Sequence, residues 1–244
     1  LKIVKAEESK VNKSYDMTRI KKSHVEYSAN QITLDLVNAD NLPMQITFNV
    51  SDNDIAFRYS LPRPKNDNPK AAIIYKEVSG FNFPSQTRTF LSPQITPMTG
   101  WERTKPSYEE EYRPDSKLTD PSQYGVGYTF PCLYRIPNAK GNNWVLISET
   151  GVTGEYPGSR LSEYEAGKGF SVTYPQKGEA NGIGSEYAAI SLPGNTPWRT
   201  ITVGSSLKPI VETTIPYDVV DPQYETKYDY KPGRYTWSWL IWQD

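Results

Sequence analysis

Apolar residues alternate with polar ones in three successive runs between residues 31 and 59. An alternation with period two predicts strands that bury one face and expose the other. Turn-forming residues separate the runs, Asn-Ala-Asp-Asn at 38–41 and Ser-Asp-Asn-Asp at 51–54. We therefore predict a three-stranded antiparallel meander. Its apolar positions are Ile32, Leu34, Leu36, Met44, Ile46, Phe48, Val50, Ile55, Phe57 and Tyr59.

The most apolar part of the chain is a pair of runs, residues 126–136 and 144–148, which predicts two paired strands. The residues between them, Pro-Asn-Ala-Lys-Gly-Asn-Asn at 137–143, predict a turn. The second run is almost wholly apolar, which indicates a strand buried on both faces. It leads into Glu149 and a glycine-bounded loop at 150–154. Because a charge at the mouth of a buried strand is costly without a cation or a hydrogen-bond network, Glu149 is the leading candidate for a functional residue.

The rest of the chain contains further short runs of β-branched residues. Residues 1–30 are lysine-rich and poorly patterned, so we expect an irregular lead-in there, in preference to a short helix at 14–22. Residues 92–121 lack periodicity and contain many prolines, which predicts a long loop, and such loops are usually functional when ordered. We expect further strands at residues 72–75, 87–91, 170–174, 187–192, 199–203 and 210–215.

About a dozen short strands with hardly any helix predict an all-β fold, a large antiparallel β-sandwich. The chain shows no internal repeat and no linker, so we expect a single domain over residues 1–244. Its 27 basic and 28 acidic residues give a net charge of −1, which argues against nucleic acid or an anionic membrane as a partner. We expect no membrane span, because no apolar run approaches the roughly 20 residues that a spanning helix needs. Aromatic residues make up 13% of the chain, which suits strands and also stacking on sugar rings.

Several short sequence blocks follow one another along the chain, each occurring once, from Asn-Asp-Ile-Ala-Phe-Arg-Tyr at 53–59 to Pro-Gly-Arg at 232–234. The others are Met-Thr-Gly-Trp at 98–101, Pro-Ser-Tyr-Glu at 106–109, Gly-Val-Gly-Tyr-Thr-Phe-Pro at 125–131, Ser-Glu-Thr-Gly at 148–151, Thr-Pro-Trp-Arg at 196–199 and Leu-Lys-Pro-Ile-Val-Glu-Thr-Thr at 207–214. In this order they resemble the amino-terminal domain of glycoside hydrolase family 97, bacterial exo-acting α-glucosidases and α-galactosidases. The resemblance covers nearly the whole chain from about Tyr15.

The resemblance implies a β-super-sandwich akin to the galactose-mutarotase-like fold. In the intact enzyme a (β/α)₈ barrel follows, and the barrel carries the catalytic carboxylates that act on an α-linked oligosaccharide. Such a chain is expected to be incomplete at its start, and residues 232–244 are expected to be the exit toward the barrel. We therefore expect no hydrolysis by this chain alone. The family also implies a periplasmic or secreted location, with a signal peptide outside this sequence.

The resemblance further implies a calcium ion in the active site, to which the amino-terminal domain lends one carboxylate. By position this residue is Glu149. Calcium takes six to eight oxygen ligands, so the remaining ligands would come from the barrel and this chain would bind calcium weakly or not at all. The alternative is a glutamate that faces solvent or pairs with an arginine.

The long loop supplies three candidates for contact with the sugar, Trp101, Tyr108 and Glu109, because they lie between the matching blocks. The adjacent carboxylates at 109–111 form a poor catalytic pair, since neighbouring side chains on an extended loop point in opposite directions. We interpret this run as a solvated acidic loop.

The single histidine and the single cysteine are poor candidates for acid–base or nucleophilic catalysis. His24 is the single histidine and lies in the lysine-rich start, so we expect it at the surface and without a catalytic role. Cys132, alone in an apolar strand, is expected to be a small buried residue. Two other functions stay open: a free-standing carbohydrate-binding module of the lectin or adhesin kind, favoured by the 18 tyrosines and 6 tryptophans, and a complete enzyme.

Overall fold

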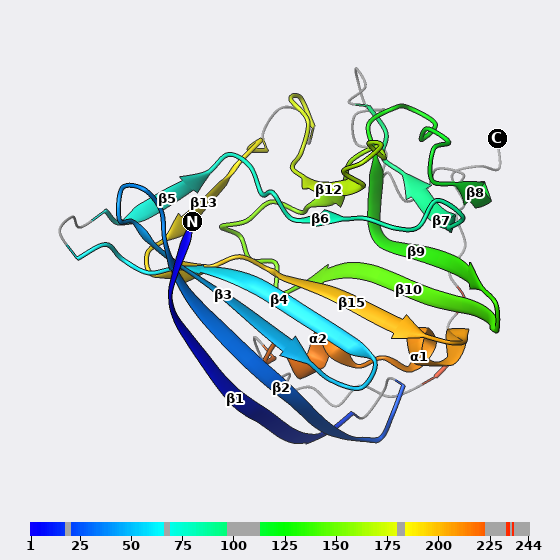
Figure 1. The fold of residues 1–244 in the computed structure, drawn as a ribbon, viewed down its shortest axis with the longest axis horizontal. Helices are drawn as coiled ribbons and strands as arrows, with labels where there is room; N and C mark the ends of the chain where they lie inside the picture. The colour runs from blue at the N-terminus through cyan, green and yellow to red at the C-terminus, as the bar shows by residue number, and fades with distance from the viewer. Residues whose placement is uncertain are drawn as a thin grey trace.

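A computed structural model describes residues 1–17, 21–65, 69–96, 113–179, 184–222, 233–234 and 236. Over these residues the chain forms fifteen strands and two short helices (Figure 1). The strands are β1 (Lys2–Asp16), β2 (His24–Val37), β3 (Pro43–Val50), β4 (Asp54–Leu61), β5 (Ala71–Ile74), β6 (Gly80–Phe81), β7 (Arg88–Pro93), β8 (Arg113–Lys117), β9 (Tyr128–Asn138), β10 (Gly141–Thr150), β11 (Arg160–Leu161), β12 (Phe170–Thr173), β13 (Ala188–Ser191), β14 (Gly194–Asn195) and β15 (Trp198–Gly204); the helices are α1 (Leu207–Glu212) and α2 (Ile215–Asp218).

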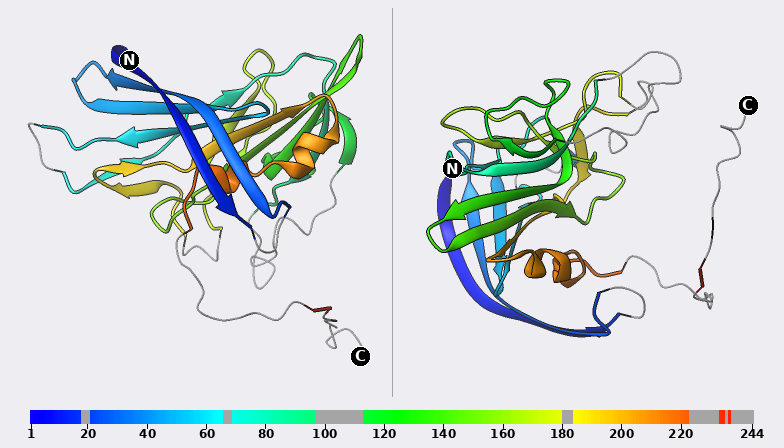
Figure 2. Two further views of the ribbon diagram at one scale, coloured as in Figure 1. Left: turned by 90° about the horizontal axis from the view of Figure 1, so that it is seen from below. Right: turned by 90° about the vertical axis from the view of Figure 1, so that its right-hand side faces the viewer.

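Thirteen of these strands form one antiparallel sheet. Ten of them follow one another in the order β1-β2-β3-β4-β15-β10-β9-β11-β12-β6. Strands β7, β8 and β14 attach beside this path, and β5 and β13 form a separate two-stranded sheet. The large sheet is strongly curved, and helix α1 lies against β15 and β10 (Figures 1 and 2). The prediction of a mostly β fold with a large antiparallel sheet and little helix is confirmed.

The main core lies where the curved sheet brings distant strands together. Phe57 of β4 and Ile147 of β10 share one cluster with Leu161 of β11 and Phe170 of β12. Aromatic rings fill its centre, since Tyr134 of β9 contacts Phe170 with ring centroids 5.5 Å apart. The sheet therefore curves around an aromatic-rich main core, and two smaller clusters lie apart from it, around Trp198 and around Tyr156.

The predicted meander is confirmed as β2, β3 and β4, which pair antiparallel in sequence. Its first turn is stabilised by Asn38, whose side-chain oxygen accepts hydrogen bonds from the backbone N–H groups of Asp40 and Leu42, both at 2.9 Å. The predicted strands at 72–75, 87–91, 170–174, 187–192 and 199–203 are also found, with ends shifted by one or two residues.

The expected irregular lead-in over residues 1–30 is wrong. Residues 2–16 form β1, which pairs with β2 from Lys2 opposite Val37 to Asp16 opposite His24. Strand β1 lies at the edge of the sheet and is exposed along nearly its whole length, so it carries no apolar alternation for sequence reading to detect. Its many lysines are typical of edge strands, where they disfavour pairing with another chain.

The expected strand at 210–215 is also wrong, because residues 210–212 belong to α1, Ile215 begins α2, and Thr213 and Thr214 are the cap residues between the two helices. Ser206 caps α1, since its hydroxyl accepts a hydrogen bond from the backbone N–H of Lys208 at 3.3 Å. Proline at 209 and 216 suits the first turn of each helix, where a backbone N–H has no helical partner. The local caps therefore outweigh the β-branched composition.

The central hairpin is longer than predicted. β9 and β10 pair through the supposed turn, so that Asn138 lies opposite Gly141 and only two residues connect the strands. Asn138 makes this turn possible by accepting a hydrogen bond from the backbone N–H of Lys140 at 2.8 Å. Burial on both faces of β10 is not found: Val145 and Ile147 are buried, while the residues between and beside them are half-buried. Strand β8 likewise occupies part of the loop predicted over 92–121.

Candidate functional site

Glu149 lies within β10, one residue before the strand ends, directly opposite Arg199 of β15. Its side chain is 12% exposed. The Nη1 group of Arg199 donates a short hydrogen bond to Glu149 Oε2, and the backbone N–H of Ser159 donates to Oε1 at 3.1 Å. Both carboxylate oxygens are therefore held, and the side chain has a defined orientation.

Arg199 is fully buried and connects Glu149 to a second carboxylate. Its Nε donates to Glu77 Oε1 at 2.9 Å and its Nη2 donates to Glu77 Oε2 at 2.6 Å, a bidentate pair. Nη2 also donates to the Ser159 hydroxyl at 3.0 Å. Tyr156 completes the cluster, because its hydroxyl donates to Glu77 Oε2 at 2.8 Å and its ring centroid lies 5.8 Å from the arginine Cζ.

The cluster of Glu77, Glu149 and Arg199 carries one more negative than positive charge when all three are ionised. Burial acts to raise the pKa of Glu77, but the hydrogen bonds and charge of Arg199 outweigh it, and this pKa lies below its ordinary value. Burial acts to lower the pKa of Arg199, but the two carboxylates raise it further above its ordinary value. The ionised forms of Glu77 and Arg199 are thus favoured. Of the two carboxylates that share Arg199, Glu149 is the more exposed, since its side chain is 12% exposed and that of Glu77 is 4% exposed.

Glu149 can serve as one ligand of a hard cation. A carboxylate has about four lone-pair sites, and the two hydrogen bonds to Glu149 leave each oxygen able to accept once more. Within the described residues the donor set is not a complete calcium site, because they contain no group of three or more His, Cys, Asp or Glu side chains that could hold a metal ion. The structure therefore fits calcium as a contributor of one carboxylate whose other ligands come from elsewhere.

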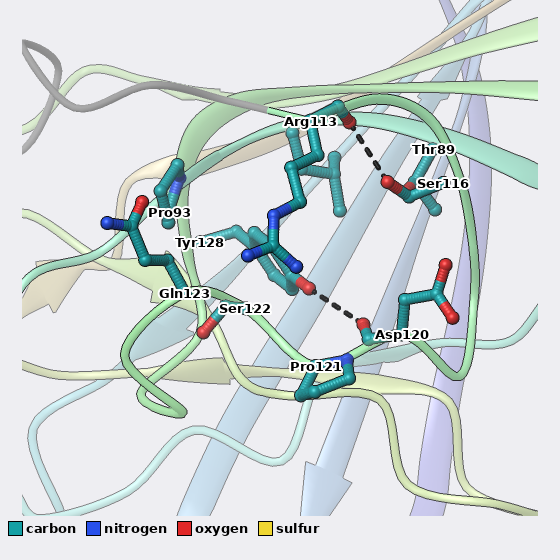
Figure 3. Close-up of a pocket in the computed structure, with 10 residues that line it drawn as sticks. Thr89, Pro93, Arg113, Ser116, Asp120, Pro121, Ser122, Gln123 and Tyr128 are labelled. Carbon is teal, nitrogen blue, oxygen red and sulfur yellow. Dashed lines mark hydrogen bonds between the residues drawn. The ribbon is translucent and has the colours of Figure 1, made fainter.

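Trp101, Tyr108 and Glu109 lie outside the described residues, so their predicted contact with sugar stays a prediction. The chain on either side of them belongs to β7 and β8, which pair with each other. A small pocket lies beside these strands, and Figure 3 shows the side chain of Arg113 extending across it toward Tyr128. The Tyr128 hydroxyl donates to the backbone carbonyl of Asp120 at 3.2 Å, and burial raises the pKa of this hydroxyl.

Two other sequence interpretations are confirmed. His24 is at the surface, where its Nδ1 lies 2.7 Å from Asp16 and its Nε2 lies 2.7 Å from Glu26. Cys132 is fully buried, and burial raises the pKa of its thiol well above the ordinary value, so it is an unreactive core residue.

The functional role predicted for Glu149 stays a prediction, and the sequence analysis missed the residues that hold its side chain, Arg199 and Ser159. One signal for Arg199 was available, namely a cation at the start of the β-branched run Thr-Ile-Thr-Val at 200–203, which needs a carboxylate partner if it is buried. Nothing in the sequence indicated Glu77 as that partner, because it is 122 residues away and lies in the irregular segment that follows β5.

The glycosyl-hydrolase 97 N-terminal family model matches residues 1–222. A solved structure described as a beta-arabinopyranosidase is 53% identical, with a TM-score of 0.91, and the match covers 100% of this chain and 38% of that one. A glycoside hydrolase family 97 enzyme from Pseudoalteromonas sp. strain K8 in complex with acarbose is 22% identical, with a TM-score of 0.67, and the match covers 88% of this chain and 29% of that one. The E480Q form of an enzyme from the same strain, in complex with panose, is 21% identical with a TM-score of 0.66 over the same shares.

The two Pseudoalteromonas matches show a shared fold. This chain spans well under half of the length of each of these structures. A comparison with curated proteins gave no match. Neither helix of the described part has the length and apolar character needed to cross a bilayer. Because the family model matches 222 of the 244 residues, the chain belongs to the glycosyl-hydrolase 97 N-terminal family.

Proposed function

We propose that this chain is the non-catalytic amino-terminal domain of a calcium-dependent glycoside hydrolase that acts on α-glycosides, in the periplasm or outside the cell. Its role is to support the catalytic barrel, to contribute Glu149 to the calcium ion and to form part of the sugar pocket with Trp101, Tyr108 and Glu109. The observation that carries the proposal is the arrangement of Glu149, a largely buried carboxylate held at the end of a central strand, which shares the cation Arg199 with Glu77.

The charge balance of the cluster supports the calcium role. A largely buried carboxylate without its own cation is costly, and a divalent ion at its accessible edge would remove this cost. When bound, calcium would supply a concentrated positive charge beside the substrate. Arg199 and the backbone N–H of Ser159 would fix the direction in which the free lone pairs of Glu149 point.

Two relatives support the substrate class. The Pseudoalteromonas enzymes were solved with acarbose and with panose. The more similar relative is described as a beta-arabinopyranosidase. A β-L-arabinopyranoside has the ring configuration of an α-D-galactoside without its hydroxymethyl group, so both substrates belong in the test beside an α-D-glucoside.

The test uses the full-length enzyme that contains this chain, with Glu149→Gln compared with Glu155→Gln. Glu155 is a matched control because it is an exposed carboxylate whose oxygens accept from the backbone and hydroxyl of Ser191. Calcium affinity is measured by calorimetry, and hydrolysis is measured with the p-nitrophenyl α-glucoside, α-galactoside and β-L-arabinopyranoside. We expect Glu149→Gln to weaken calcium binding at least about tenfold, since even residues behind the ligands change metal affinity by 10–100-fold.

Glu155→Gln is expected to leave calcium affinity unchanged. Equal calcium affinity of the two variants would refute the role of Glu149. Hydrolysis by the 244-residue chain alone would refute the non-catalytic role of the domain.

One observation favours the second candidate, a carbohydrate-binding module. Tyr75 and Tyr187 are exposed beside the small sheet of β5 and β13, with ring centroids 5.5 Å apart. Titration of the isolated chain with maltose and galactose, before and after Tyr75→Ala, separates the two functions. Saturable binding that Tyr75→Ala abolishes would favour the module.

A further inference from the structure

Arg58 of β4 is a partly buried cation without a counter-charge in the described part of the chain. Its guanidinium lies over the ring of Trp198, with Cζ 4.5 Å from the ring centroid. Its Nε atom is buried and has no hydrogen-bond partner. None of the ion pairs among the described residues includes Arg58. Trp198 itself is buried in β15, so the ring fixes the plane of the guanidinium.

Three other arginines of the described chain, unlike Arg58, form ion pairs with carboxylates. Arg199 is bidentate to Glu77, Arg160 is bidentate to Glu179 at 2.7 and 2.6 Å, and Arg135 pairs with Asp115. For Arg58, burial lowers the pKa and no nearby carboxylate opposes this effect. Stacking on an aromatic ring compensates only part of the cost of removing a guanidinium from water.

Arg58 lines a polar groove together with residues of β1 and the end of α2. The other charged residues of this groove already have partners. Lys13 pairs with Asp221 at 3.0 Å. Asp218 accepts hydrogen bonds from the hydroxyls of Tyr15 and Thr214, and Glu155 accepts from Ser191. The partners of Asp218 and Glu155 are neutral groups, whereas Arg58 is the charged side chain among the described groove residues that makes neither a side-chain hydrogen bond nor an ion pair.

We infer that this groove receives an acidic side chain, carried by the remainder of the glycoside hydrolase, whose carboxylate pairs with the Arg58 guanidinium. The two Nη groups form a planar fork that matches the two oxygens of a carboxylate. Asn195 also lines the groove; its side-chain oxygen accepts a hydrogen bond from Ser60, which leaves its amide NH2 group as a neutral donor for the segment that carries the acid. The inference rests on the proposed function, because it requires a further module in the same protein.

The position of the groove favours a polypeptide over a free ligand. Val220 and Asp221 line it, and the part of the chain that matches the family model ends at residue 222. The match with the beta-arabinopyranosidase covers 38% of that chain, so the solved relative contains much additional polypeptide. A segment connected next to the groove has a high effective concentration there, which allows a single charge pair to be occupied.

The first experiment identifies the partner directly. Arg58→Lys places an amine at this site in the full-length enzyme, and a carbodiimide joins it to any carboxylate in contact with it. Mass spectrometry is expected to find an isopeptide bond from position 58 to an Asp or Glu outside residues 1–244. The 3.0 Å pair of Lys13 and Asp221 serves as the internal control for the reaction. A product that links position 58 only to Glu155, Asp218 or Asp221, or no product when the control pair reacts, would overturn the inference.

The second experiment compares Arg58→Met in the full-length enzyme and in the isolated 244-residue chain. We expect the melting temperature of the full-length enzyme to fall by several degrees and that of the isolated chain to stay unchanged or to rise. Arg135→Met is the matched control, because Arg135 also lies over a ring, that of Phe90 at 5.9 Å, but has its partner Asp115 within the chain. This control is expected to change both proteins equally.

An equal loss in both proteins from Arg58→Met would mean that Arg58 only supports Trp198, and would overturn the inference. Stabilisation of the isolated chain by sodium glucuronate, abolished by Arg58→Met, would overturn it in favour of a free sugar acid. Failure of the proposed function is distinguished from these results, because calcium-dependent hydrolysis by the unmutated full-length enzyme is measured independently of Arg58.

Discussion

Replacement of Arg199 by methionine tests the physical basis of the site. Arg199 has no exposed surface, and its guanidinium makes four hydrogen bonds to Glu77, Glu149 and Ser159. Methionine retains much of the apolar volume but leaves two carboxylates in the interior without a cation. Breaking a buried ion pair by removing one partner costs about 3–5 kcal/mol. Since a domain is stable by about 5–15 kcal/mol, Arg199→Met should remove a large part of the free energy of unfolding.

The loss of stability caused by Arg199→Met should depend on pH in a defined direction. In the unmutated chain the pKa of Glu77 lies below its ordinary value, so its contribution to stability is present above that ordinary value and is lost as pH falls through the folded pKa. Without Arg199, burial acts to raise the pKa of Glu77 and only the hydrogen bonds from Ser79 and Tyr156 oppose it, so we expect this pKa to rise and the variant to become less stable as pH rises. The difference in free energy of unfolding between the two proteins is therefore largest near neutral pH and smaller in acid.

Urea denaturation followed by tryptophan fluorescence, between pH 4 and pH 8, measures both quantities. Arg135→Met is a control, because its ion pair with Asp115 is much more exposed and should contribute less than about 1 kcal/mol. A loss below about 1 kcal/mol for Arg199→Met, or a loss that is the same at every pH, would refute the reasoning. Circular dichroism confirms that the variant retains its sheet before the comparison is made.

Three further variants test other parts of the fold. Phe170→Ala should lower the free energy of unfolding in urea by about 3–5 kcal/mol, because this ring is fully buried at the centre of the core; a loss below about 1 kcal/mol would contradict its placement. Gly127→Ala should cost at least about 1–3 kcal/mol in the same assay, since φ is +93° and a Cβ would lie 2.0 Å from the carbonyl oxygen of Leu161. Burial and then the charge of Asp54 raise the pKa of Asp218, so the unmutated chain should lose stability as pH rises through the range in which Asp218 ionises. Asp218→Asn should abolish this loss, and an unchanged pH profile of the melting temperature would contradict the prediction.

The sequence predicts those strands whose two faces differ in environment. The alternation of apolar and polar residues over 31–59 predicted strands that are found as β3, β4 and the second half of β2, although β2 begins earlier than expected, at His24. Strand β1 makes a long ladder with β2 but faces solvent, so no pattern of apolar residues records it. Helix α1 was mistaken for a strand because Ile210 and Val211 are β-branched, although Ser206 and the proline at 209 are the capping signals of a helix.

The residues of the site likewise divide into one that a local sequence pattern indicates and two that it does not. Glu149 was recognised because a charge follows an apolar run, which is a local property of the sequence. Its partner Arg199 is opposite it only because β10 and β15 pair in one particular register, and Glu77 joins them from a segment near β5. Register between strands that are distant in sequence depends on the packing of the whole sheet, so no local pattern reveals these contacts.

The composition of this cluster argues for a role beyond stability. Apolar residues of similar volume at the positions of Glu77, Glu149 and Arg199 would be neutral or stabilising, because a buried ion pair gains little over its desolvation cost. An arginine and two carboxylates achieve something that an apolar core cannot, namely a carboxylate with a fixed direction and an uncompensated charge at its more exposed end. Glu77 satisfies Arg199 through two hydrogen bonds, and Arg199 therefore holds Glu149 without neutralising the cluster. A site that must present one carboxylate to a cation bound mainly by another module requires this combination of rigidity and residual charge.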